Sequence, residues 1–161
     1  GKKLRYFDPE INESYVPYVV ETSIGLDRLF LLTMCQAFEE EQLDNETRTV
    51  LKFPPALAPI KAAILTLVRK DGLPEMAEKL YNELKFDFNV HIEDKDSIGK
   101  RYRRMDAIGT PFCITIDHDS LENEDCTIRY RDTMEQKRIK LSEVAAILHA
   151  ETSMSSLLKS L

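Results

Sequence analysis

The chain has 161 residues, enough for one ordinary domain with an appendage, and its hydrophobic content of 43% suits a folded globular protein. It carries 22 lysine and arginine residues against 28 aspartate and glutamate residues, and the net charge of −6 argues against a protein that coats nucleic acid through its overall charge. The apolar runs are far too short to cross a bilayer, so we expect no membrane partner.

The three cysteines are Cys35, Cys113 and Cys126, an odd number without a C-x-x-C pair. This pattern favours core thiols in a reducing compartment over a disulfide framework or a zinc site. No cationic and apolar signal peptide opens the chain, and the first residue is Gly1 rather than Met. We therefore interpret the sequence as a fragment or processed chain from the cytoplasm.

The first third of the chain predicts few regular elements. Residues 1–15 are polar and irregular, and the segment YVPYVVETS, residues 15–23, predicts a short extended segment. Apolar residues at helical spacing then predict a largely buried helix over residues 25–43, whose acidic run Glu39–Glu41 would be its solvated end. The polar stretch 43–49 indicates a connector, and we place a domain boundary between residues 48 and 49.

From residue 50 the pattern alternates between strands and helices after a proline-rich entry that cannot be helical. Strands are predicted at 60–68, 88–94, 111–117, 126–131 and 137–141. Helices are predicted at 70–86, 98–108 and 143–150. A polar loop is predicted at 118–125, and a further turn or helix in the tail 151–161. The order β-α-β-α-β-β-β-α predicts an α/β fold with a mixed five-stranded sheet flanked by helices, parallel at its start and antiparallel at its end.

The segment SIGKRYRRMDAIGTPF, residues 97–112, stands out in this acidic chain. Five basic residues and one acid, Asp96, lie between positions 95 and 104: Lys95, Lys100, Arg101, Arg103 and Arg104. On a helix, Ile98, Tyr102, Met105 and Ile108 share the apolar side, and the basic residues lie opposite or on the flank. Such a helix is either a solvated amphipathic helix or a surface that tracks phosphates.

A second basic patch lies in RYRD. The two-residue period of a strand places Arg129 and Arg131 on the same side, with Asp132 following at the turn. Arginines beside an aromatic residue are suited to unstacked RNA bases. The histidines are scattered, and His118 between two aspartates has no second His or Cys nearby, so we predict no metal site.

Together these segments resemble one family. VETSIGLDRLF is similar to motif 3 of class II aminoacyl-tRNA synthetases, and LKFPPALAPIKAAILTL, DSIGKRYRRMDAIGTPFCITID and RYRDTMEQ resemble the anticodon-binding domain of the homodimeric glycyl-tRNA synthetases. The likeness runs from Tyr15 to about Leu148. It departs from the family at Thr22 and Thr66, where Pro is usual, and at Tyr130, where Asp is common.

The resemblance implies that residues 1–48 are the strand-helix end of a class II catalytic domain and residues 49–161 an anticodon-binding domain. It implies a parent enzyme that activates glycine with ATP and Mg²⁺ and esterifies glycine tRNA. The implied glycine-binding residues are Glu21, Thr22 and Ser23, and the implied ATP-binding residues are Gly25, Asp27 and Arg28. The implied tRNA-binding residues are Lys100, Arg101, Arg103, Arg104, Arg129, Arg131 and Asp132, with the last three as candidates for reading the anticodon.

The family's motifs 1 and 2 are not in this sequence, so we expect the chain alone to be inactive and to hold no cofactor. The resemblance also implies a parent homodimer with no DNA partner. Two other interpretations stay open: a non-catalytic nucleic-acid-binding module of the same fold, such as a polymerase accessory subunit, or an unrelated α/β interaction domain whose basic helix has no function.

Overall fold

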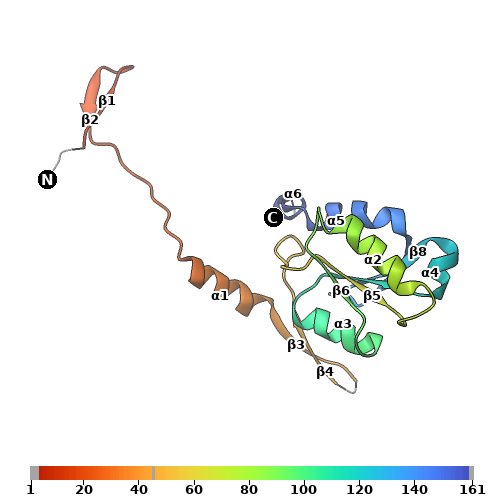
Figure 1. Ribbon diagram of the computed structural model, residues 1–161. Coiled ribbons are helices and arrows are strands. Elements are labelled where there is room, and N and C mark those ends of the chain that lie inside the picture. Colours follow the sequence, from red (N-terminus) through yellow and green to blue (C-terminus); the bar gives the residue numbers. More distant parts are fainter. Residues whose placement is uncertain (1–3, 45, 160–161) are drawn as a thin grey trace. The chain divides into compact units, whose positions relative to one another are not determined.

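The computed structural model describes residues 4–44 and 46–159, and they form two compact units, residues 1–31 and residues 32–161 (Figure 1). In the first unit, β1 (Tyr6–Asp8) and β2 (Glu13–Tyr15) form a small antiparallel hairpin where the sequence predicted irregular chain. Residues 16–25 have no regular structure and are exposed, so the predicted extended segment forms no strand beyond Tyr15, the last residue of β2. The last two residues of the predicted tail lie outside the described residues.

Helix α1 (Leu26–Ala37) is shorter and more exposed than predicted. Its one buried residue is Ala37, whereas Leu26 and Phe30 are 79% and 66% exposed, so the prediction of a largely buried helix is wrong for this structure. The acidic run is not a helix end either. Phe38–Gln42 forms strand β3, which pairs with β4 (Thr47–Leu51) as an antiparallel hairpin. The predicted boundary between residues 48 and 49 falls inside β4.

The second unit is built on the predicted five-stranded mixed sheet, in the order β6-β5-β7-β8-β9. Strand β5 (Ala62–Thr66) pairs in parallel with β6 (Val90–Glu93) and β7 (Phe112–Ile116), whereas β8 (Asp125–Tyr130) pairs antiparallel with β7 and with β9 (Gln136–Lys140). All five residues of β5 are buried, as expected for a central strand that is covered on both faces.

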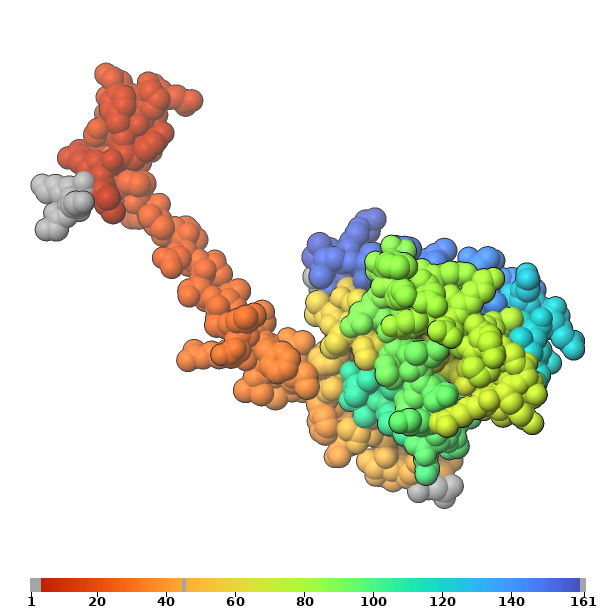
Figure 2. Space-filling view, viewed as in Figure 1, coloured from red at the N-terminus to blue at the C-terminus, as the bar shows by residue number. Residues whose placement is uncertain are grey.

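Two helices cover one face of this sheet and one covers the other (Figure 1). Helix α2 (Leu73–Leu84) and α5 (Val144–Thr152) enclose the main core, in which Ile64, Ile114 and Ile128 are fully buried. Helix α3 (Ile98–Ala107) packs on the opposite face, where Met105 joins Ala63, Leu65 and Cys113. On the side seen in Figure 2, α2 covers much of the surface of this unit.

Three shorter elements complete the second unit. Residues 118–123, predicted as part of a loop, form helix α4 (His118–Asn123), because Asp117 and Ser120 make a reciprocal capping box at its start. A 3₁₀ turn, η1 (Leu141–Glu143), leads into α5, and α6 (Met154–Lys159) supplies the predicted tail helix. Gly109, with a positive φ of 81°, ends the turn after α3 and lets the chain enter β7.

Candidate nucleic-acid interface

The side chains of helix α3 do not divide into one apolar and one basic face as the amphipathic pattern predicted, because Arg101 is buried and Ile108 is exposed. Tyr102 and Met105 pack toward the sheet as predicted, but Ile108 is 44% exposed. Arg101 is 2% exposed, and its Nη1 donates to the backbone oxygens of Thr66 at 2.7 Å and Glu93 at 3.1 Å. Burial lowers the pKa of its guanidinium. Arg101 therefore has a structural role and does not lie on the predicted basic surface.

The other basic residues of α3 reach the surface. Arg103 and Arg104 are partly exposed, and Lys100 is exposed without an ion pair to any described residue. Arg104 bonds Glu93 at 2.6 Å and Asp96 at 2.8 Å, and these hydrogen bonds raise the pKa of its guanidinium. Arg103 pairs with a carboxylate of the β3–β4 turn, Glu46. Of these three surface cations, Arg103 and Arg104 are thus paired with acids of the described residues.

Arg129 lies in β8 and Arg131 follows the last residue of that strand, and both side chains are buried in the interior. They are 3% and 1% exposed. Arg131 donates to the backbone oxygens of Gly109 at 2.8 Å and Phe53 at 2.7 Å, and to the exposed carboxylate of Asp132 at 2.7 Å. Because protein groups already occupy its guanidinium, the expectation that Arg131 contacts a base does not hold for this structure, and Asp132 is partnered by Arg131.

The centre of this interior network is a residue that the sequence analysis did not single out. Asp106 is 0% exposed and accepts from Arg129 Nη1 at 2.8 Å, Arg129 Nη2 at 3.0 Å and Arg48 Nε at 2.9 Å. Arg48 also donates to Glu41 at 2.6 Å and to the backbone oxygen of Arg131 at 2.5 Å. Burial lowers the pKa of Arg48, but the bonds to Asp106 and Glu41 outweigh it, and the net shift is upward. The network fastens the β3–β4 hairpin to α3 and β8.

A hollow of about 430 Å³ opens beside this network, where α3 leaves the face of β8 and β9 uncovered. Its lining comes from the β3–β4 turn, α3, β8, β9 and the turn between β8 and β9: Glu46, Gly99, Lys100, Tyr102, Arg103, Arg129, Met134 and Gln136. Three of these side chains are cationic and one is acidic. Open space beside Gly99, with no atom within 4 Å of an added Cβ, keeps the rim accessible.

Tyr102 forms one wall of the hollow in a fixed orientation. The guanidinium of Arg129 lies 4.8 Å from the centre of its ring, and its hydroxyl is 2.6 Å from Thr115 Oγ1. Burial raises the pKa of the Tyr102 hydroxyl, which stays protonated and neutral. The hollow therefore combines surface cations, an aromatic wall and a polar amide, which are the groups that bind single-stranded RNA.

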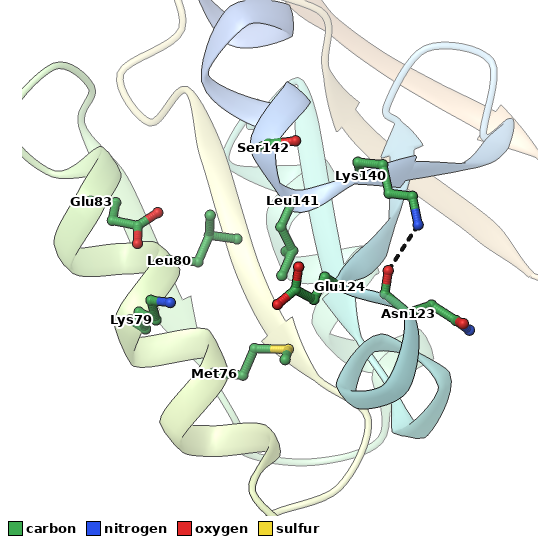
Figure 3. Close-up of a pocket in the computed structure, with 9 residues that line it drawn as sticks. All are labelled: Met76, Lys79, Leu80, Glu83, Asn123, Glu124, Lys140, Leu141 and Ser142. Atoms are coloured by element: carbon green, nitrogen blue, oxygen red, sulfur yellow. Dashed lines mark hydrogen bonds between the residues drawn. The ribbon is translucent and has the colours of Figure 1, made fainter.

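A second hollow, of about 360 Å³, lies on the other side of the sheet between α2, the end of α4 and η1 (Figure 3). Its lining includes two lysines and two glutamates, and Lys140 Nζ donates to the backbone oxygen of Asn123 at 2.8 Å. The balanced charges and the lack of an exposed aromatic wall make it a poorer match for RNA than the hollow beside α3.

The residues implied for glycine and ATP lie in the first unit and its exposed segment. Glu21, Thr22, Ser23, Gly25, Asp27 and Arg28 are exposed. Gly25 accepts a hydrogen bond from the backbone of Leu29 at 3.0 Å, and Arg28 packs near Gly25. Within residues 4–44 and 46–159 these side chains do not enclose a pocket, and no group of acidic, His or Cys residues is arranged to hold a metal ion.

Comparison with known proteins assigns the second unit. Residues 61–151, more than half of the chain, match the family described as Anticodon binding domain. The chain belongs to the anticodon binding domain family. A solved RNA-binding domain of threonyl-tRNA synthetase from Cryptosporidium parvum Iowa II has the same fold, with a TM-score of 0.56 and 22% identity over 62% of this chain and 25% of that one. The predicted fold class is thereby confirmed.

Curated relatives are more similar in sequence. Glycine--tRNA ligase of Bacillus cereus is 57% identical over 148 residues, and that of Chlorobaculum tepidum is 51% identical over 148 residues; each match covers 92% of this chain and 32% of the relative. Glycine--tRNA ligase of Rhodopirellula baltica is 47% identical over 161 residues, and this match covers 97% of this chain and 30% of the relative. The chain thus spans about a third of the length of these relatives.

In the described part of the chain, no helix is long and apolar enough to cross a membrane.

Proposed function

We propose that this chain is part of a glycine-tRNA ligase and that its second unit binds the anticodon stem-loop of glycine tRNA. The observation that carries the proposal is the 57% identity to a glycine-tRNA ligase over 92% of the chain. Membership of the anticodon binding domain family supports the same function. An acidic protein can bind RNA in this way, because charges beyond roughly 8 Å from the bound phosphates are screened at physiological salt.

The hollow beside α3 is the proposed place of contact. Lys100 and Arg103 supply exposed cations for the RNA backbone, and the ring of Tyr102 and the amide of Gln136 line the same hollow for an unstacked base. Arg104 lies at the edge of this surface and can bind an RNA phosphate once the phosphate replaces its acidic partners, Glu93 and Asp96. Arg101, Arg129 and Arg131 are assigned to the support of this surface, because their guanidinium groups are bound inside the protein.

The parent enzyme activates glycine with ATP and Mg²⁺ and transfers it to the tRNA. Glu21, Thr22 and Ser23 belong to its glycine pocket, in which the carboxylate of Glu21 pairs with the substrate ammonium. Gly25, Asp27 and Arg28 belong to its ATP site, in which Arg28 binds phosphate through charge-assisted hydrogen bonds. Residues 1–48 are assigned to the catalytic domain of this homodimeric, cytoplasmic parent, and the remaining catalytic groups come from sequence outside this chain.

The test is binding of the full chain to a glycine tRNA transcript and to the same transcript with an altered anticodon. We expect tighter binding of the unaltered transcript, and no ATP–pyrophosphate exchange by the chain alone. Equal binding of both transcripts would indicate a generic nucleic-acid module. No binding to either would contradict the proposed function.

A further inference from the structure

One acidic side chain lines the otherwise cationic hollow. Glu46 lies in the turn between β3 and β4, and its side chain is 56% exposed. Its carboxylate accepts from Nε of Arg103 at 3.1 Å and also binds Nη2 of the same guanidinium. One of the two surface cations of the hollow is therefore already paired in the RNA-free protein.

The position of Glu46 is built into the fold. Arg48, two residues further along β4, is anchored to the buried carboxylate of Asp106 at 2.9 Å. The backbone oxygen of Glu46 accepts from the nitrogen of Leu43 at 2.9 Å, which closes the turn. Helix α3 therefore contacts the β3–β4 hairpin twice. Its Asp106 anchors the hairpin through Arg48, and its Arg103 pairs with the carboxylate of Glu46.

The two kinds of ion pair in this region differ in how easily they open. Arg129 and Asp106 are 4% and 0% exposed in their side chains, and breaking that pair would leave a buried charge uncompensated. Arg103 is 33% exposed, and it and Glu46 are both open to water, where such a pair contributes little stability. Nη1 of Arg103 also lies 3.8 Å from the carboxylate of Asp106. Arg103 can therefore exchange Glu46 for another anion and remain beside Asp106, while the shorter bonds of Asp106 to Arg48 and Arg129 stay closed.

This exchange depends on the incoming RNA. A phosphate that displaces Glu46 forms an ion pair with Arg103. It then lies close to the released carboxylate of Glu46, which is also negative and repels it. A base edge with an amino group, such as that of cytosine, can donate to this carboxylate and remove the penalty. We propose, on the basis of the proposed function, that Glu46 is a specificity-determining residue, which admits RNA loops that offer it a hydrogen-bond donor and weakens binding of all others.

The experiment compares Glu46→Gln with Asp44→Asn, which removes one negative charge from the same turn but not from the hollow. Binding of the full chain is measured with two RNA hairpins, the glycine anticodon stem-loop and the same stem-loop with altered anticodon bases. We expect Glu46→Gln to tighten binding of the altered hairpin by about 3- to 10-fold, as for loss of one repulsive rim charge, and to leave the glycine hairpin unchanged or weaker. Asp44→Asn should shift both hairpins by the same factor, about 2-fold or less.

The outcomes separate this inference from the function on which it rests. If the unmodified chain prefers the glycine hairpin and Glu46→Gln keeps the full preference, the role of Glu46 is overturned and the proposed function stands. If Glu46→Gln and Asp44→Asn change both hairpins alike, only net charge matters, and the role is again overturned. If the unmodified chain binds both hairpins equally, the proposed function fails, and the inference fails with it.

Discussion

The guanidinium of Arg129 donates from both terminal nitrogens to the carboxylate of Asp106, at 2.8 and 3.0 Å, and the same carboxylate accepts from Arg48 at 2.9 Å. One buried acid thus holds two buried arginines that come from β8 and from β4. The same Arg129 lies over the ring of Tyr102. The interior network and the candidate RNA surface are therefore connected through one side chain.

Replacement of the central acid should destabilise the fold. Asp106→Asn leaves Arg129 buried without a counter-charge and Arg48 with Glu41 alone, and we expect the free energy of unfolding to fall by about 3–5 kcal/mol. Urea denaturation followed by circular dichroism measures the change. Asp87→Asn is the matched control, because Asp87 is exposed, and it should change the stability by about 0.5 kcal/mol or less. Equal midpoints for the two variants would contradict the assigned role of the network.

Two glycines, one inside α3 and one just after it, should respond in opposite ways to replacement by alanine. At Gly109 the φ is +81°, and an added Cβ would lie 2.5 Å from Phe53 Cδ2 and 3.0 Å from the backbone oxygen of Leu51. We expect Gly109→Ala to cost roughly 2–4 kcal/mol, from backbone strain and overpacking. Gly99 lies in α3 with open space around it, so Gly99→Ala should be neutral or stabilise by up to about 1 kcal/mol. Thermal unfolding of both variants checks the contrast, and a stable Gly109→Ala protein would refute it.

Loss of the surface cations should lower the salt dependence of RNA binding. The double variant Lys100→Ala, Arg103→Ala removes the exposed charges of the hollow, and we expect the slope of log K against log salt to fall by at most about two. The control Lys79→Ala, Lys85→Ala removes the same charge from α2 on the other face of the sheet. Fluorescence anisotropy with a labelled stem-loop at several salt concentrations gives the slopes. Identical slopes for both double variants would place the RNA elsewhere.

The cysteines should differ in reactivity. Burial raises the pKa of the Cys113 and Cys126 thiols to about 12, so both stay protonated at neutral pH, whereas Cys35 is exposed. Iodoacetamide at pH 8 should label Cys35 in the folded chain and all three thiols in urea, as read by mass spectrometry. The folded state binds these thiol protons more tightly than the unfolded state, so stability should fall as the pH rises from about 9 toward 12. Labelling of Cys113 at the rate of Cys35 would contradict this burial.

Periodicity predicted the sheet and its helices, because the core of the second unit is set by local patterns. The buried runs of β5 and β7 and the helical spacing in α2 each identify the residues that pack inward. The β3–β4 hairpin was missed because Glu39–Glu41 has low strand propensity, and its pairing with β4 and the ion pairs of Glu41 supply what the propensity lacks.

The sequence identified the basic segment that borders the hollow, but it did not show which of the arginines are bonded inside the protein. The basic segment does border the hollow. The charge pattern of a helix or strand does not show, however, which guanidinium groups hydrogen-bond to acceptors inside the protein. Asp106 and Arg48 are 58 residues apart in sequence, so no local pattern could pair them. The one available signal was the single acid that follows the basic run in RYRRMD.

The span of this network has a consequence for how the protein is made. Arg48 leaves the ribosome well before Asp106, and its acceptor on Arg131 follows 83 residues after it. The hairpin cannot obtain its interior partners until β8 has been synthesised, because long-range closure must wait for the distant strand. The face proposed to contact RNA is therefore completed late during translation, and a nascent chain that stalls before residue 131 lacks the backbone oxygen to which Arg48 donates in the finished protein.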